Sequence, residues 1–224
     1  MFYNGSRKIR IQVINNITYY VKELSEQEII AEVIASRLGK ILNFNAVENY
    51  QRDMQTLYSK KYDQAIDETI VDSGYNLDKV ITESIYDMCI FDYLTINRDR
   101  HIKNIEILED RRFNTYRLSS LFDFNISLLS TTSDEALSVV DWNYDPITQN
   151  FNNKTLLQNL QTVYNNAYYK EIPKDKIYLF EFVDLFTNEE FADPYINNRI
   201  SVLLDSINIR IERLINLGIL QAIN

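Results

Sequence analysis

Three oxygen-bearing side chains from two segments could together serve phosphoryl transfer. Asp99 and Asn104 stand at the two ends of Asp99-Arg100-His101-Ile102-Lys103-Asn104, and Asp123 follows the apolar pair Leu121-Phe122. Phosphoryl transfer requires a carboxylate that orients the attacking hydroxyl, oxygen ligands for Mg²⁺, and a cation on the nucleotide phosphates. We therefore predict that Asp99 orients the acceptor and that Asn104 and Asp123 are metal ligands.

Lys22 is the predicted cation. It closes the apolar strand Tyr19-Tyr20-Val21, from which its ammonium group would reach the nucleotide phosphates. A carboxylate on the following helix should hold this lysine in place. Glu28 and Glu32 lie one turn apart there, and helical periodicity does not choose between them.

His101 is the single histidine of the chain, which excludes a site built from several histidines of this chain. A Ser-His-Asp triad would need His101 as its base, and no serine stands in a nucleophile elbow. Between Asp99 and Asn104 a histidine is more often a structural support than a catalyst. We keep His101 as a catalytic candidate beside Asp99.

The composition is that of a globular protein. Of 224 residues, 46% are hydrophobic, which is enough for a packed core, and the net charge of -9 argues against nucleic acid or an anionic membrane as the main partner. The lone Cys89 lies in an apolar run, so one chain can form no disulfide. Neither a signal peptide nor a membrane span is predicted, which favours the cytoplasm, although secretion without a cleaved signal is also compatible.

Hydrophobic patterning predicts an α+β fold with a strand-rich front and a helical back. The front should contain a hairpin of residues 9–13 and 17–21, a helix from a capping box at Ser25 and Glu28 to about residue 43, and strands at 44–47 and 54–58. The back should contain two short strands and four helices, at residues 105–108, 116–118, 77–94, 156–164, 176–186 and 196–217. A boundary near residue 62 would separate two lobes, 1–62 and 63–224, with the nucleotide in the cleft between them.

Four segments in order resemble the HipA-like kinases. They are Tyr19-Tyr20-Val21-Lys22, Ala31-Glu32-Val33-Ile34-Ala35, the run from Phe91 to Asn104, and Leu121-Phe122-Asp123-Phe124-Asn125. The resemblance implies a two-lobed protein-kinase-like fold that phosphorylates Ser or Thr of a protein with ATP and Mg²⁺, as a bacterial effector or as a toxin with an antitoxin partner. It also implies Asp99 as catalytic base, Asn104 and Asp123 as metal ligands, Lys22 as phosphate lysine and Glu32 as its partner.

The same resemblance suggests contacts to the rest of the nucleotide. The strand crossover at Ser59-Lys60-Lys61-Tyr62 would be the hinge that meets adenine, and Gly5 with Ser6 would belong to the phosphate loop, where Ser6 is either an autophosphorylation site or a turn residue. The chain departs from the pattern at Asn125, where such kinases often have glycine. Asn is tolerable there because it adopts positive φ more readily than most residues.

Two alternatives stay open. Phosphatidylinositol kinases share the Asp-Arg-His-x-x-Asn run, so a lipid could be the acceptor. The sparse glycine content of the predicted phosphate loop, which has only Gly5, is also compatible with a catalytically silent module that binds nucleotide.

Overall fold

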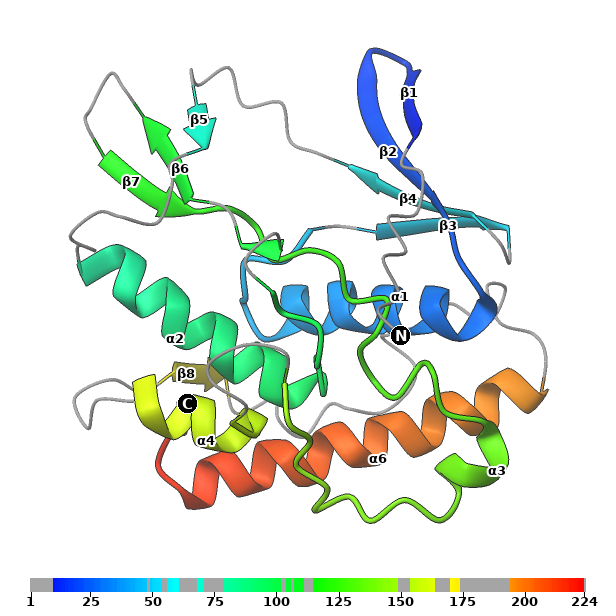
Figure 1. The fold of residues 1–224 in the computed structure, drawn as a ribbon, viewed down its shortest axis with the longest axis vertical. Helices are drawn as coiled ribbons and strands as arrows, with labels where there is room; N and C mark the ends of the chain where they lie inside the picture. The colour runs from blue at the N-terminus through cyan, green and yellow to red at the C-terminus, as the bar shows by residue number, and fades with distance from the viewer. Residues whose placement is uncertain are drawn as a thin grey trace.

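The fold is described from a computed structural model (Figure 1). It describes residues 10–47, 49–53, 56–60, 68–70, 79–101, 104–105, 107–110, 115–148, 154–163, 170–173 and 194–223. Gly5, Ser6 and Tyr62, together with the helix predicted at 176–186, lie outside these ranges. Among the described residues, no helix has the length and apolar character needed to cross a membrane.

An antiparallel four-stranded sheet forms the front of the molecule, in the order β1 (Arg10–Ile14), β2 (Ile17–Glu23), β4 (Thr56–Lys60) and β3 (Asn49–Asp53). The hairpin of β1 and β2 turns at Asn15-Asn16, whose φ angles of 51° and 61° are those of a type I′ turn. Asn is one of the few residues that adopt this conformation at little cost. The predicted hairpin is therefore confirmed.

Helix α1 (Glu26–Ile41) lies next to this sheet, in contact with β3 (Figure 1). It begins as predicted at Ser25, where the Glu28 carboxylate accepts hydrogen bonds from the backbone N–H (2.8 Å) and the hydroxyl (2.7 Å) of Ser25. Most of its residues are buried, including polar ones on the side away from the apolar stripe. The helix therefore has protein on nearly every side.

The other helices within the described residues are α2 (Lys79–Leu94), α3 (Asp134–Leu137), α4 (Leu156–Val163) and α6 (Pro194–Asn216). Pro194 takes the first position of α6, where its missing N–H would have no helical partner in any case. The helices predicted at 77–94, 156–164 and 196–217 are confirmed to within two residues at each end. In Figure 1, α4 and α6 lie on the opposite side of the molecule from the four-stranded sheet.

Two smaller sheets complete the described structure. One is antiparallel, with β5 (Glu68–Ile70), β6 (Ile107–Asp110) and β7 (Thr115–Leu118) in that order, and the other is the parallel pair of β8 (Lys170–Pro173) and β9 (Leu220–Ile223). Strands β6 and β7 correspond to the short strands predicted at 105–108 and 116–118. The boundary near residue 62 and its two lobes stay a prediction, since residues 61–67 lie outside the described part of the chain.

The strand predicted at residues 44–47 is wrong. This segment forms only an isolated parallel bridge, between Ala46 and Leu121. Val47 N–H donates to the Leu121 carbonyl (2.9 Å), and Leu121 N–H donates to the Asn45 carbonyl (2.7 Å). The segment thus pairs with the chain just before Asp123 rather than with the sheet. The strand predicted at 54–58 is confirmed in part, because β4 covers its second half.

One hydrophobic core joins the front and the back of the molecule. The ring of Phe91 on α2 lies 4.9 Å from the ring of Phe44 and 5.3 Å from the ring of Phe124, centroid to centroid. These three aromatic residues connect the segment after α1, the last turn of α2 and the segment that carries Asp123. Buried residues of α6 belong to the same core. The packing therefore fixes α1 against α2.

Gly39 near the end of α1 allows this close approach. A Cβ atom at Gly39 would lie 2.6 Å from the Cβ of Ala46, which is attached directly to backbone and cannot swing away. So short a Cβ–Cβ distance places the overpacking cost in the upper half of the usual range, at about 2–3 kcal/mol, and alanine adds about 1 kcal/mol of helix propensity. We therefore expect Gly39→Ala to lower the free energy of unfolding by roughly 1–2 kcal/mol. Urea denaturation measures this change.

The matched test is Gly39→Ala combined with Ala46→Gly, which removes the opposing Cβ. In the Ala46→Gly background, Gly39→Ala should therefore lower the free energy of unfolding much less than it does in the parent. A Gly39→Ala protein as stable as the parent would contradict this account of the contact.

Candidate functional site

Lys22 at the end of β2 meets two carboxylates. Its Nζ lies 2.7 Å from Oδ1 of Asp123 and 3.2 Å from Oε1 of Glu32 on α1. The Glu32 side chain is almost fully buried, while that of Asp123 keeps 30% of its exposure. The structure thus brings together three predicted site residues that are 10 and 101 positions apart along the chain.

The choice between Glu28 and Glu32 is settled by their contacts. Glu28 is engaged by Ser25 at the start of α1, whereas Glu32, one turn later, reaches Lys22. Burial alone would lower the pKa of Lys22, but the charges of Glu32 and Asp123 outweigh it and raise that pKa above its usual value. The Lys22 side chain is therefore positively charged at physiological pH.

The Asp99 loop follows α2 and is shaped by its own polar groups. The Asp99 backbone N–H donates to the Asn97 side chain (3.1 Å), while the Asp99 carbonyl accepts from the backbone N–H of His101 (2.8 Å) and from Nδ2 of Asn104 (3.0 Å). The Asn104 amide is nearly buried. Because its nitrogen is occupied by Asp99, the amide oxygen is the atom that can serve a metal ion.

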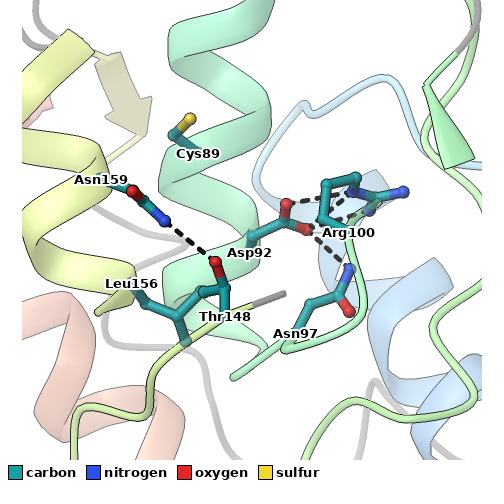
Figure 2. A pocket seen from close by; sticks show the side chains of 7 residues that line it. All are labelled: Cys89, Asp92, Asn97, Arg100, Thr148, Leu156 and Asn159. Carbon is teal, nitrogen blue, oxygen red and sulfur yellow. Dashed lines mark hydrogen bonds and ion pairs between the residues drawn. The ribbon is translucent and has the colours of Figure 1, made fainter. Parts of the chain in front are cut away.

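Arg100 ties this loop to the rest of the site. Its buried guanidinium makes a two-pronged ion pair with Asp92 of α2, with nitrogen–oxygen distances of 2.9–3.3 Å (Figure 2). From Nη1 it also donates to the Asn104 carbonyl (3.0 Å) and to the Phe122 carbonyl (2.8 Å). One side chain therefore fixes the backbones beside both predicted metal ligands to the same helix.

Asn97 supports the same pair from below in Figure 2. Its Nδ2 donates to Oδ1 of Asp92 at 2.8 Å, and its Oδ1 accepts from Asp99 as described above. The group lines a small cavity with Cys89, Thr148 and others, and burial raises the pKa of the Cys89 thiol to about 12. That cysteine is therefore a neutral packing residue at physiological pH, as its apolar surroundings predicted.

Asp123 has a left-handed backbone, with φ of 62°. Asp tolerates this conformation better than most residues do. Asn125 was judged tolerable in place of glycine because Asn adopts positive φ readily, but Asn125 does not have positive φ, so this tolerance is not used. Leu128 and Leu129 do, at 49° and 52°, and both are buried. The backbone strain after Asp123 therefore lies three to four residues further along than expected.

The Asp99 carboxylate interacts with the negative charge of Asp123. Burial raises the pKa of Asp99 above its usual range, and the charge of Asp123 raises it further, although His101, Arg100 and Arg98 act in the opposite direction. A carboxylate with a raised pKa is a better proton acceptor than an ordinary surface aspartate.

The other predicted site residues are placed only in part. The contacts of His101 described above come from its backbone, and within the described residues its Nδ1 is buried without a partner. Lys60 ends β4, where its backbone pairs with Tyr19, but nothing is described of its side chain. Gly5, Ser6 and Tyr62 lie outside the described residues, so the predicted phosphate loop and adenine contact stay predictions.

The residues present fit Mg²⁺ as a metal shared with a nucleotide. Carboxylate and amide oxygens are hard ligands that suit this ion, which usually takes one or two carboxylates and completes its shell with phosphate oxygens and water. Across the described ranges, no group of three or more His, Cys, Asp or Glu side chains could hold a metal ion alone. If Asn104 and Asp123 held Mg²⁺, phosphate oxygens and water would have to complete its shell.

Comparison with known proteins shows the fold. No protein-family model and no curated protein matches the chain. Its structure is similar to a crystal structure described as that of a Helicobacter pylori proinflammatory kinase CtkA, with 18% sequence identity and a TM-score of 0.64 over 95% of this chain and 98% of that one. The chain has a kinase-like α+β fold. The prediction of kinase-like architecture is thereby confirmed, while membership of the HipA-like family stays a prediction.

The sequence-based interpretation missed Asp92, Asn97 and Arg100. Asp92 did carry a signal, since it is the one charge within Ile90-Phe91-Asp92-Tyr93-Leu94, where a buried ion pair is the usual explanation. Arg100 carried none, because a basic residue in a polar loop is normally exposed. Only its partners in the folded chain show its role.

Proposed function

We propose that this protein is a kinase that uses ATP and Mg²⁺ to phosphorylate Ser or Thr residues of a protein. The observation that carries the proposal is the ion-pair cluster of Lys22, Glu32 and Asp123. Arg100 joins the Asp99 loop to the segment of Asp123, because it donates to the carbonyls of both Asn104 and Phe122. The similarity of fold to a kinase structure supports it. A cytoplasmic site of action, an antitoxin partner and a role as toxin or effector belong to the same proposal.

Each side chain has a role in the proposed reaction. Asp99 orients the acceptor hydroxyl and takes its proton, while the hydroxyl oxygen bonds to the γ-phosphorus of ATP and ADP leaves. Lys22 binds the phosphates of ATP, and Glu32 keeps Lys22 aimed at them. Asn104 and Asp123 would hold Mg²⁺, which supplies positive charge to the phosphate oxygens. His101 is a positioning residue that fixes Asp99 and Asn104 through its backbone.

Transfer of labelled γ-phosphate tests the proposal. The protein is incubated with Mg-ATP alone, with a protein lysate and with phosphoinositide vesicles, and intact mass records any phosphate on the chain itself. Label on Ser or Thr of protein supports the proposal. Label on lipid alone would show a lipid kinase, and ATP binding without any transfer would show a silent nucleotide-binding module.

Asp123→Asn is expected to weaken binding of Mg-ATP by about tenfold or more, which corresponds to ~1.4 kcal/mol or more. The variant loses a charged metal ligand and also one of the two carboxylates on Lys22. Calorimetric titration with Mg-ATP, and with ATP in EDTA, separates these effects, because only the first depends on the metal.

The matched control is Asp141→Asn, an exposed carboxylate whose described bonds stay within its own turn. It should bind Mg-ATP like the parent. If Asp123→Asn also bound Mg-ATP with parental affinity, Asp123 would not be a metal ligand.

A further inference from the structure

The C-terminal end of α1 is closed by a turn that a distant lysine caps. Asn43 has left-handed φ of 56°, and the Phe44 N–H donates to the Gly39 carbonyl (2.7 Å), which would otherwise lack a helical partner. The Asn43 carbonyl then accepts a hydrogen bond from Nζ of Lys170 at 3.1 Å. The end of α1 is therefore tied to a residue 127 positions further along the chain.

Lys170 joins three elements through its ammonium group. It is the first residue of β8, and its Nζ lies 2.7 Å from Oδ2 of Asp87 on α2. The same Nζ lies 4.9 Å from the centroid of the Phe44 ring, within the ~6 Å of a cation–π contact. The Lys170 side chain keeps only 14% of its exposure, so water screens these contacts little.

The backbone of Lys170 is fixed as well. Its N–H donates to the Ile219 carbonyl at 3.0 Å, where β8 begins to pair with β9. Ile172 of β8 and Leu220 of β9 are both buried beside this pairing. Lys170 is therefore anchored at its backbone by the C-terminal strand and at its ammonium by α1 and α2.

The same helix α1 carries Glu32 to Lys22. Glu32 precedes Ile41, the last residue of α1, by nine residues, which is about 14 Å along the helix axis. Because a helix moves nearly as a rigid rod, a displacement of its end is passed on to Glu32. The contact from Lys22 to Glu32, at 3.2 Å, is long for a charge-assisted hydrogen bond, whereas the contact to Asp123, at 2.7 Å, is not. A small shift of α1 would therefore leave Lys22 to Asp123 alone.

We propose that Lys170 is a positioning residue for Lys22. By fixing the end of α1, it keeps Glu32 within reach of Lys22, and so keeps the Lys22 ammonium directed toward the nucleotide phosphates rather than toward Asp123. Lys170 acts through α1 and is assigned no contact with the nucleotide. The inference rests on the proposed kinase function, because it concerns how the phosphate lysine of that site is held.

Calorimetric titration with Mg-ATP and with adenosine tests this role on the full chain, well below the unfolding temperature. Lys170→Met should weaken binding of Mg-ATP by about three- to tenfold, because Lys22 is misplaced but still present. It should leave binding of adenosine unchanged, because adenosine has no phosphate for Lys22. The matched control is Ile172→Val, which removes a buried methyl group from the same strand and should lower stability without changing either affinity.

A double-mutant cycle with Glu32→Gln tests the route through α1. Once Glu32 no longer holds Lys22, Lys170→Met should weaken binding of Mg-ATP by less than about twofold further. Lys170→Arg keeps the charge and should recover most of the affinity. If Lys170→Met fails to fold, Asp87→Asn removes the carboxylate that holds the ammonium, and should weaken binding of Mg-ATP selectively by a smaller factor.

The outcomes separate the inference from the proposed function. An equal loss of affinity for Mg-ATP and adenosine would overturn the inference while the proposed kinase stands, because a general structural defect would explain it. Full additivity of Lys170→Met and Glu32→Gln, or parental affinity for Mg-ATP in both Lys170→Met and Asp87→Asn, would also overturn it alone. A parent chain that bound no Mg-ATP would overturn the kinase and the positioning role together.

Discussion

Asp99→Asn should remove phosphoryl transfer and leave binding of Mg-ATP close to that of the parent. A general base contributes about 10²–10⁴-fold to rate, so we expect kcat to fall within that range. Asn has nearly the same shape as Asp, and the backbone bonds of residue 99 to Asn97, His101 and Asn104 do not involve the lost charge. Steady-state kinetics and nucleotide titration on the same preparation separate the two effects.

The same substitution should stabilise the nucleotide-free protein. The pKa of Asp99 is raised in the folded state, so its ionisation opposes folding wherever pH lies above that raised value. This cost disappears as pH falls below the usual Asp value of 3.8, where the group is protonated in folded and unfolded chains alike. Asp99→Asn should therefore raise the Tm at pH 7 in EDTA, with a smaller gain at acidic pH.

Asp205→Asn, on the exposed side of α6, is the control for loss of a single charge. It should change neither kcat nor the Tm appreciably. Full transfer activity in Asp99→Asn would rule out Asp99 as the base. A lower Tm at pH 7 would show that the carboxylate has a favourable partner in the folded chain.

Arg100→Met should have the largest effect on stability. The substitution leaves Asp92 buried without its cation, and breaking a buried pair in this way costs about 3–5 kcal/mol. It also removes the two bonds that Arg100 makes to the carbonyls of Asn104 and Phe122. We therefore expect a marked fall in the free energy of unfolding by urea denaturation, together with loss of transfer.

Two variants keep this prediction testable if Arg100→Met fails to fold. Arg100→Lys retains the charge but loses the two-pronged geometry, and should lie between Arg100→Met and the parent in stability. Asp92→Leu with Arg100→Met replaces the pair by apolar groups and should recover much of the stability, but not the transfer activity. Arg10→Met breaks an exposed pair with Glu23 and should change stability by less than about 1 kcal/mol.

The sequence predicts this site where local patterns carry the information. The apolar strand that carries Lys22 and the helix before Asp99 were predicted correctly, whereas Asp123 follows only an isolated bridge at Leu121 and not a strand. The capping box at Ser25 was also readable, and its occupation of Glu28 is what leaves Glu32 for Lys22. Helical periodicity could not identify Glu32 as the partner of Lys22, because α1 is buried on nearly all sides and has no exposed polar face with which to compare it.

Long-range pairing accounts for what the sequence did not predict. Residues 44–47 have strand-like composition, but their partner is the segment of Leu121, some 75 residues away. Arg100 joins Asp92 to the carbonyl of Phe122, a relation that no local window contains. Leu128 and Leu129 are buried and have positive φ, although leucine seldom adopts that conformation, so residue type does not predict it. Such features depend on the assembled chain.

The three aromatic rings of Phe44, Phe91 and Phe124 bear on modularity. Since they join the end of α1 to α2 and to the segment that carries Asp123, the sheet-bearing portion should not behave as a separate module. A fragment that began after residue 62 would leave Phe91 and Phe124 facing water where Phe44 and α1 now lie. We consequently expect one cooperative thermal transition, in which a destabilising substitution in either portion lowers the Tm of both.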